Sequence, residues 1–276
     1  MAAAGGEVVQ AGALLRGGAL PPAESRALLC SVLGMSRETL IAHPETAVTP
    51  EQRERFDAAV AQRSAGMPLA YLLGEQEFYG YRFRVSPAVL VPRPETELLV
   101  DTALAIVRGK RAARVLELGT GSGCVAIALG LRQPGLFIVA SDASPDALCL
   151  ARENRLRLGA TVHLVAGHWY APLRGRFDLI VSNPPYIAAG DAHLEDLRHE
   201  PYCALSDGGD GLGALRAIIG GATGFLAPGG DLLVEHGHDQ GAAVRTLMLD
   251  SGLRSVRTLG DLAGHERVCW GQAPGA

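Results

Sequence analysis

From about residue 113 to the C-terminus, the chain alternates short apolar runs typical of strands with segments typical of helices. This alternation predicts an α/β fold, in which a mostly parallel sheet carries helices on both faces. Ligands bind beyond the carboxyl ends of the strands in such sheets, so residues that follow a strand are the first candidates for a site. The expected strands are 114–118, 137–141, 162–165, 177–181 and 231–235, with two more before the C-terminus. The expected helices start at residues 123 and 145 or lie near 212–225 and 240–250.

The N-terminal part of the chain has a different character. Its sequence pattern predicts short helices that are interrupted by glycine and proline pairs. The clearest helix start is Thr49-Pro50-Glu51-Gln52, a capping box with proline at the first helical position. This signal predicts a helix of about 14 residues. We therefore expect a small helical domain over residues 1–74, which by itself carries no catalytic cluster.

A connecting segment follows the helical part. Between residues 68 and 92, aromatic residues alternate with polar ones, a pattern typical of a β-hairpin. We expect a hairpin linker over 75–92 and the α/β domain over 93–276. A helix is expected over 94–107, and Glu95 and Glu97 lie in its first turn. These carboxylates either cap the helix dipole or support a site.

Composition argues against several kinds of site. The 25 lysines and arginines nearly balance the 29 aspartates and glutamates, so no net positive charge indicates nucleic-acid binding. The cysteines include no C-x-x-C pair, so we expect neither a metal site nor disulfides, but buried thiols in a reducing compartment. They are Cys30, Cys124, Cys149, Cys203 and Cys269.

Nothing resembles a signal peptide or an apolar span of roughly 18 residues, so we expect a cytoplasmic protein with no membrane contact.

The first expected strand of the α/β domain runs into a glycine-rich turn that follows an acidic residue, Glu117. Glycines permit a tight turn and close approach by a ligand, although such turns also occur for packing reasons. The G-x-G-x-G spacing differs from the dinucleotide fingerprint that holds a pyrophosphate, which suits a cofactor without phosphates. Asp142 ends the second strand, where a carboxylate accepts both ribose hydroxyls, and Glu117 is placed to meet a cationic amino group. S-adenosylmethionine satisfies all of these requirements.

Trp169 follows the third strand, where it either flanks the adenine or is a half-buried core residue. The full set of expected cofactor-binding residues is Glu117, Gly119, Thr120, Gly121, Ser122, Gly123, Asp142, Trp169 and Asn183.

The tetrapeptide Asn183-Pro184-Pro185-Tyr186 follows the fourth expected strand. Its prolines stiffen the turn and donate no hydrogen bonds. The Asn183 side-chain oxygen and the Pro184 carbonyl are suited to accept both hydrogens of a planar NH2 group, and Tyr186 offers it a flat face. The alternative is a β-turn that happens to contain Asn-Pro. We predict that all four residues bind the substrate and that Asn183, Pro184 and Tyr186 are catalytic, because they align the acceptor nitrogen.

The glycine turn, Asp142 and the tetrapeptide resemble the class I S-adenosylmethionine-dependent methyltransferases that modify amide or exocyclic amino nitrogens. Further segments narrow the resemblance to the HemK family over nearly the whole chain: 68–75, 91–97, Glu200-Pro201, Asp210-Gly211-Leu212 and Glu235-His236-Gly237. The resemblance implies a Rossmann-like methyltransferase domain. It also implies methyl transfer to the side-chain amide of the glutamine in the Gly-Gly-Gln motif of peptide chain release factors.

The release factor is accordingly the expected partner, with no direct nucleic-acid binding, and the protein is expected to be a monomer. Because a single glutamine offers little surface for specificity, we interpret residues 1–74 as the partner-recognition domain. The chain departs from the family pattern at Glu117, where aspartate is commoner, at His168, where an acidic residue is expected, and at His199, where an aromatic residue is common. Any contact between the His168 side chain and the cofactor is therefore in doubt.

Two other functions stay open from the sequence. An adenine N6 methyltransferase of DNA or RNA would offer the same two hydrogen bonds to an exocyclic amino group, but the balanced charge argues against it. A non-enzymatic module that binds a nucleotide or a partner on the sheet is the second alternative. The presence of both Asn183 and Tyr186 argues against that module.

Overall fold

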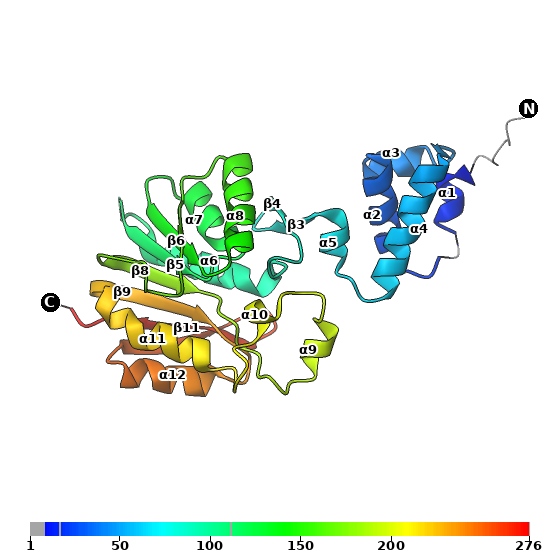
Figure 1. The fold of residues 1–276 in the computed structure, drawn as a ribbon. Helices are drawn as coiled ribbons and strands as arrows, with labels where there is room; N and C mark the ends of the chain where they lie inside the picture. The colour runs from blue at the N-terminus through cyan, green and yellow to red at the C-terminus, as the bar shows by residue number, and fades with distance from the viewer. Residues whose placement is uncertain (1–8, 17, 111, 276) are drawn as a thin grey trace, which may run out of the picture. The chain divides into compact units, whose positions relative to one another are not determined.

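The computed structural model describes residues 9–16, 18–110 and 112–275. Its internal contacts divide the chain into two units, Met1–Glu75 and Gln76–Ala276. Figure 1 colours both units from the N-terminus in blue to the C-terminus in red.

A seven-stranded sheet forms the centre of the second unit. Its strands are β5 (Arg114–Leu118), β6 (Phe137–Asp142), β7 (His163–Ala166), β8 (Phe177–Ser182), β9 (Leu226–Glu235), β10 (Arg254–Gly260) and β11 (Glu266–Gln272). They are ordered β10-β11-β9-β8-β5-β6-β7. The five strands from β9 to β7 are parallel, whereas β11 is antiparallel to both of its neighbours. This order confirms the expected mostly parallel sheet, and it places a topological switch point at β5, with β6 on one side and β8 on the other.

Helices cover both faces of this sheet (Figure 1). One face carries α6 (Glu97–Val107), α7 (Cys124–Arg132) and α8 (Pro145–Leu158), and the other carries α11 (Gly213–Phe225) and α12 (Gly241–Asp250). Neighbouring strand residues point to opposite faces, so Val115 belongs to the first core and Leu116 to the second, and both are fully buried. Burial on both faces explains why these strands appear in the sequence as continuous apolar runs.

The expected hairpin is formed by β3 (Glu75–Phe78) and β4 (Tyr81–Arg84). Its two-residue turn, Tyr79-Gly80, has positive φ at both positions, as a type I′ turn requires. The Tyr79 amide donates to the Glu97 carboxylate at 2.7 Å, so that carboxylate holds the hairpin. The helix expected over 94–107 begins as a 3-10 turn, η1 (Pro94–Thr96), and continues as α6.

Asn154 of α8 is a buried polar residue that joins this hairpin to the glycine-rich turn. Its side chain accepts from the Arg84 amide at 2.6 Å and donates to the Arg84 carbonyl at 3.0 Å. The same side-chain NH2 donates to the Ser122 carbonyl at 2.9 Å. Both of its donor hydrogens and one of its two acceptor positions therefore hold backbone next to the expected site.

The first unit is helical, apart from a two-residue pairing of β1 (Val9–Gln10) with β2 (Ala47–Val48). Its helices are α1 (Ala11–Leu14), α2 (Pro22–Leu33), α3 (Arg37–Ala42), α4 (Pro50–Ser64) and α5 (Leu69–Leu73). The capping box at Thr49 is confirmed, because Thr49 and Gln52 exchange side-chain-to-backbone hydrogen bonds at the start of α4. The core of the unit includes Leu28, Leu29 and Phe56.

The cysteines are placed differently from the expectation. Cys269 is buried, but Cys149 and Cys203 are exposed, so the prediction of buried thiols is wrong for these two. A thiol is only weakly polar, so a cysteine on a helix can face either the core or the solvent at little cost.

Within the described residues, none of the helices combines the length and apolarity that a bilayer crossing requires.

Candidate active site

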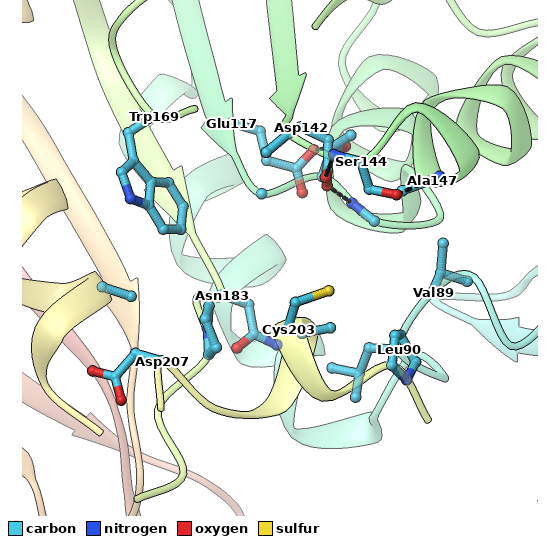
Figure 2. A pocket seen from close by; sticks show the side chains of 18 of the residues that line it. Val89, Leu90, Glu117, Asp142, Ser144, Ala147, Trp169, Asn183, Cys203 and Asp207 are labelled. Carbon is cyan, nitrogen blue, oxygen red and sulfur yellow. Dashed lines mark hydrogen bonds between the residues drawn. The ribbon is translucent and has the colours of Figure 1, made fainter. Parts of the chain in front are cut away.

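A cavity of about 720 Å³ lies beyond the carboxyl ends of β5, β6 and β8. This is the topological switch point of the sheet, where α/β folds place their ligands. The volume falls within the range of small-molecule sites, roughly 300–1,000 Å³. Figure 2 shows its wall, with residues contributed by segments that are far apart in the sequence.

The glycine-rich turn forms one wall of this cavity. Gly119, Gly121 and Gly123 all have positive φ, a backbone conformation that favours glycine. The amides of Gly119 and Thr120 both donate to the Ser141 carbonyl, at 2.9 and 3.0 Å, which fixes the turn against β6. The cavity is lined by Gly119, Thr120, Gly121 and Ser122.

Gly123 is the exception within this turn, because it does not line the cavity. A Cβ atom at Gly123 would lie 2.8 Å from Ile127 Cδ1 and 3.3 Å from Ala151 Cβ. The glycine therefore permits close packing of α7 against α8. It shapes the turn, and it stands outside the residues that line the cavity.

Asp142 is held rigidly at the end of β6. Its Oδ2 accepts from the Gly121 amide at 2.8 Å, and its Oδ1 accepts from the Ser144 amide at 2.9 Å. A carboxylate oxygen has two lone pairs, so each oxygen keeps one for a ligand. Asp142 lines the cavity (Figure 2). This geometry suits the predicted role of accepting both hydroxyls of a ribose.

Glu117 is a buried carboxyl group that lines the same cavity. Its Oε2 accepts from the Thr120 hydroxyl and from the Ala126 amide. Burial raises the pKa of Glu117 to about 8 in spite of these two hydrogen bonds. A cationic group in the cavity would compensate the buried charge, so the site fits a ligand that carries an ammonium group.

Trp169 lies across the cavity from Val89 and Leu90 (Figure 2). Its φ of 46° is unusual for a residue with a bulky side chain. The indole lies close to the glycine-rich turn, since a Cβ atom at Gly119 would be 3.6 Å from Trp169 Cζ3. His168 also lines the cavity, at the position where an acidic residue was expected. The apolar walls on two sides suit a flat aromatic base.

Asn183 lies where β8 ends, and β8 is tied to β5 there because the Ser182 hydroxyl donates to the Leu118 carbonyl at 2.7 Å. The Asn183 side-chain NH2 donates to the Thr96 hydroxyl at 3.1 Å. In the described part of the chain, no hydrogen bond to Asn183 Oδ1 or to the Pro184 carbonyl is found. Both oxygens are therefore available to accept from a bound group.

Only two of the four tetrapeptide residues belong to the cavity wall. Asn183 and Pro185 line the cavity, whereas Pro184 and Tyr186 do not. The Tyr186 hydroxyl donates to Glu235 Oε1 at 3.4 Å, and burial raises the pKa of Tyr186, so this hydroxyl stays protonated at neutral pH.

The backbone at Tyr186 is fixed from two sides. Its carbonyl accepts from Gln240 Nε2 at 2.9 Å. A Cβ atom at Gly211, where φ is 77°, would lie 2.4 Å from the same carbonyl oxygen. Only glycine fits at this position, which explains part of the segment Asp210-Gly211-Leu212 that the sequence analysis singled out. The stiffness expected from the prolines is thus increased by contacts from distant segments.

Sequence reasoning missed several residues of the cavity. Thr96, which lies between Glu95 and Glu97 in the sequence, accepts a hydrogen bond from the Asn183 side chain. Asp207 lines the cavity and accepts from the amides of Gly209 and Gly213 at 2.9 and 2.5 Å. An aspartate ahead of a glycine-rich run is a recognisable turn signal and could have identified Asp207. Cys203 also lines the cavity (Figure 2), and no sequence signal marked it.

Comparison with known proteins agrees with the sequence resemblance. Residues 8–74 match the PrmC N-terminal domain, and residues 94–261 match the Methyltransferase small domain. The release factor glutamine methyltransferase of Bordetella pertussis is 50% identical over 262 residues, 94% of this chain and 97% of that protein. Its counterpart in Neisseria gonorrhoeae is 48% identical over 258 residues, 92% of this chain and 94% of that protein.

Among solved structures, a methyltransferase from Pyrococcus furiosus has a similar fold, with a TM-score of 0.55 and 20% identity. The match covers 83% of this chain and 100% of that one. It confirms the class I methyltransferase fold that the sequence predicted. The two relatives are 50% and 48% identical over nearly their whole length, so they identify the family more narrowly than the fold does. The chain belongs to the release factor glutamine methyltransferase family.

Proposed function

We propose that this chain transfers the methyl group of S-adenosylmethionine to the side-chain amide nitrogen of the glutamine in the Gly-Gly-Gln motif of peptide chain release factors. The observation that carries the proposal is Asn183, which lines the cavity and has an uncommitted acceptor oxygen. An amide NH2 is a group that such an oxygen recognises. The names of the relatives give the substrate class.

Within this proposal the cofactor is held by the glycine-rich turn, by Asp142 and by Glu117. When bound, S-adenosylmethionine would supply a methyl group on a positively charged sulfur, which would leave as a neutral thioether while the methylated amide nitrogen loses one proton to water. Asp142 accepts from the ribose hydroxyls, and Glu117 faces the ammonium group. Trp169 flanks the adenine. The carboxylate of Asp142 is pre-oriented by two backbone amides, so little ordering is needed on binding.

The chain acts on the acceptor chiefly by positioning it. Asn183 Oδ1 and the Pro184 carbonyl each accept one hydrogen of the glutamine amide, which aims the nitrogen lone pair at the methyl group. Tyr186 and Pro185 limit the movement of the amide plane. Alignment of this kind can supply roughly 7–11 kcal/mol of a reaction barrier. Asn183 has the leading role, because it lines the cavity whereas Pro184 and Tyr186 do not.

A methyl-transfer assay with radiolabelled cofactor tests the proposal against its nearest alternative. We expect label on a release factor and none on DNA or RNA. We also propose that the chain works as a monomer in the cytoplasm, without binding nucleic acid directly. Label on nucleic acid, with none on the release factor, would favour the adenine N6 methyltransferase.

Glu117 makes cofactor binding dependent on pH. Its pKa is raised to about 8 by burial, so the carboxyl group is mostly protonated in the empty protein at neutral pH. Only the ionised form compensates an ammonium group, so binding at pH 7 should release a proton. Affinity should therefore rise with pH below 8, by up to about ten-fold per unit. Calorimetry between pH 5.5 and 7.5 measures this slope.

Glu117→Gln is the matched control for that measurement. The amide keeps the shape of the side chain but neither ionises nor compensates a cation. The variant should bind more weakly at pH 7.5 and should show a nearly flat dependence on pH. An unchanged slope in the variant would assign the titration to another group.

The N-terminal unit is the proposed partner-recognition domain, with boundaries at 1–74, 75–92 for the hairpin linker and 93–276 for the methyltransferase domain. A chain that starts at Gln76 should bind S-adenosylmethionine normally and should methylate a short Gly-Gly-Gln peptide at the full-length rate. On the intact release factor, kcat/KM should fall by at least about ten-fold, equivalent to roughly 1.4 kcal/mol of binding. Equal rates on the intact factor would show that the unit is not needed for recognition.

A further inference from the structure

Gln240 stands just before α12, and three segments of the α/β unit meet at its side chain. Its Oε1 accepts from the Gly237 amide at 2.9 Å, and its Nε2 donates to the Tyr186 carbonyl at 2.9 Å. The same Nε2 donates to the Gly211 carbonyl at 3.3 Å. None of these bonds caps α12. Gly211 and Gly237 each belong to a segment that the family resemblance singled out, so Gln240 joins both segments to the tetrapeptide.

These contacts fix the direction of the Gln240 side-chain amide. A primary amide has one oxygen and two N–H donors, and here a backbone N–H faces the oxygen while two backbone carbonyls face the nitrogen. The reversed amide would place its oxygen against both carbonyls and its NH2 against the Gly237 N–H. The NH2 therefore holds the Tyr186 carbonyl beside the Gly211 carbonyl.

The tetrapeptide offers few backbone groups by which it can be held. Pro184 and Pro185 carry no N–H, and in the proposed function the Pro184 carbonyl has to stay free for the acceptor amide. The proline rings fix φ at both positions, and the residue before each proline is restricted to extended conformations. Because the turn has so little freedom of its own, a group that holds its last carbonyl also sets the direction of the carbonyls before it.

The chain after the tetrapeptide pairs with the loop that contains Gly211. The amides of Ile187 and Ala189 donate to carbonyls of this loop, each at 2.9 Å. The carboxylate of Asp207 shapes the loop, because it accepts from three of its backbone amides at 2.5, 2.9 and 3.2 Å. The loop is therefore a rigid support against which Gln240 holds the tetrapeptide.

We infer that Gln240, by holding the Tyr186 carbonyl, directs the Pro184 carbonyl at the acceptor amide. The inference rests on the proposed function, since this direction matters only for a substrate that offers N–H groups. Gln240 stands outside the residues that line the cavity, so its role is one of positioning. The cofactor-binding residues Glu117 and Asp142 lie on β5 and β6, so a change at Gln240 should disturb the acceptor and leave the cofactor in place.

Gln240→Glu is the variant that isolates this role. The side chain keeps its shape, and an oxygen still faces the Gly237 amide, but both N–H donors give way to a carboxylate oxygen. That oxygen repels the Tyr186 carbonyl, which the NH2 had held. We expect kcat for methylation of a release factor to fall by up to about 100-fold, as for a misplaced reacting group, with the affinity for S-adenosylmethionine nearly unchanged.

Gln240→Met is a second variant, which replaces Gln240→Glu throughout if the introduced charge prevents folding. Methionine is unbranched and adaptable, so it removes the two donors without adding a repulsive charge. Its kcat should lie between those of the wild type and Gln240→Glu. Asp239→Asn is the matched control, because it changes the charge of the preceding, exposed residue and should retain the wild-type kcat.

The decisive step repeats Gln240→Glu in an Asn183→Ala background. Asn183 Oδ1 and the Pro184 carbonyl hold the same NH2 group, so an acceptor that has already lost one of them has little alignment left to lose. The fall in kcat caused by Gln240→Glu should therefore shrink to less than about ten-fold in this background. General damage to the fold would instead lower kcat by the same factor in both backgrounds.

The outcomes separate the inference from the proposed function. A large loss of kcat with intact cofactor affinity, and a much smaller loss beside Asn183→Ala, support the inference. A wild-type kcat in Gln240→Glu, or the same factor lost in both backgrounds, overturns it while the wild-type chain still methylates the release factor. A wild-type chain that leaves the release factor unmethylated overturns the proposed function, and with it this inference.

Discussion

Asn183→Ala should lower kcat for release factor methylation by roughly 100- to 1,000-fold, the usual cost of removing one pre-oriented hydrogen bond from a reacting group. The variant loses the acceptor oxygen that lines the cavity, and the substrate amide can then rotate out of line. KM should change far less, because one neutral hydrogen bond contributes about 0.5–1.5 kcal/mol to binding. Steady-state kinetics with intact release factor measures both quantities.

Asn183→Asp is the informative comparison for that result. It keeps an oxygen at the same place but loses the NH2 that donates to Thr96. If the oxygen carries the effect, the aspartate variant should retain more activity than the alanine variant, provided that calorimetry shows similar cofactor affinity in both. Equal losses would mean that the Asn183 nitrogen matters at least as much, and the positioning described above would be wrong.

Asp142→Ala should weaken S-adenosylmethionine binding by about 1.5–3 kcal/mol for each hydrogen bond lost to the charged group. The alanine removes both proposed ribose acceptors. It also leaves the amides of Gly121 and Ser144 without the carboxylate that now orients them. Isothermal calorimetry with the cofactor gives the affinity directly.

Asp142→Asn is the control of matched size. Asparagine keeps one acceptor oxygen, so its affinity should fall between those of the wild type and the alanine variant. Unchanged affinity in Asp142→Ala would remove Asp142 from the cofactor site. A loss of the same size in both variants would indicate that the negative charge, and not the number of acceptors, is what the cofactor requires.

The features that the sequence predicted are those fixed by local or repeating constraints. Strands 114–118 and 177–181 are buried on both faces, so their apolar runs are unambiguous. The glycine-rich turn needs positive φ, which glycine marks in the sequence. Asp142 ends a strand next to that turn because parallel strands bring their carboxyl ends to one edge.

The features that the sequence did not predict depend on contacts between distant segments. Thr96 reaches Asn183 across 87 positions, and nothing in either local pattern specifies the pairing. The Tyr186 hydroxyl donates to Glu235, and the Tyr186 backbone carbonyl is held by Gln240 and lies against Gly211, all of which are distant in the sequence. At Gly123 the structure adds a packing requirement that the motif did not reveal, because a Cβ atom there would lie 2.8 Å from Ile127 Cδ1.

Mass spectrometry of a release factor incubated with this chain and S-adenosylmethionine tests the central claim most directly. We expect the factor to gain one methyl group, and fragmentation should place it on the side-chain amide of the glutamine in the Gly-Gly-Gln motif. A parallel reaction with a factor in which that glutamine is replaced by alanine should show no gain. A methyl group on another residue, or an equal gain in the alanine-substituted factor, would contradict the proposed function.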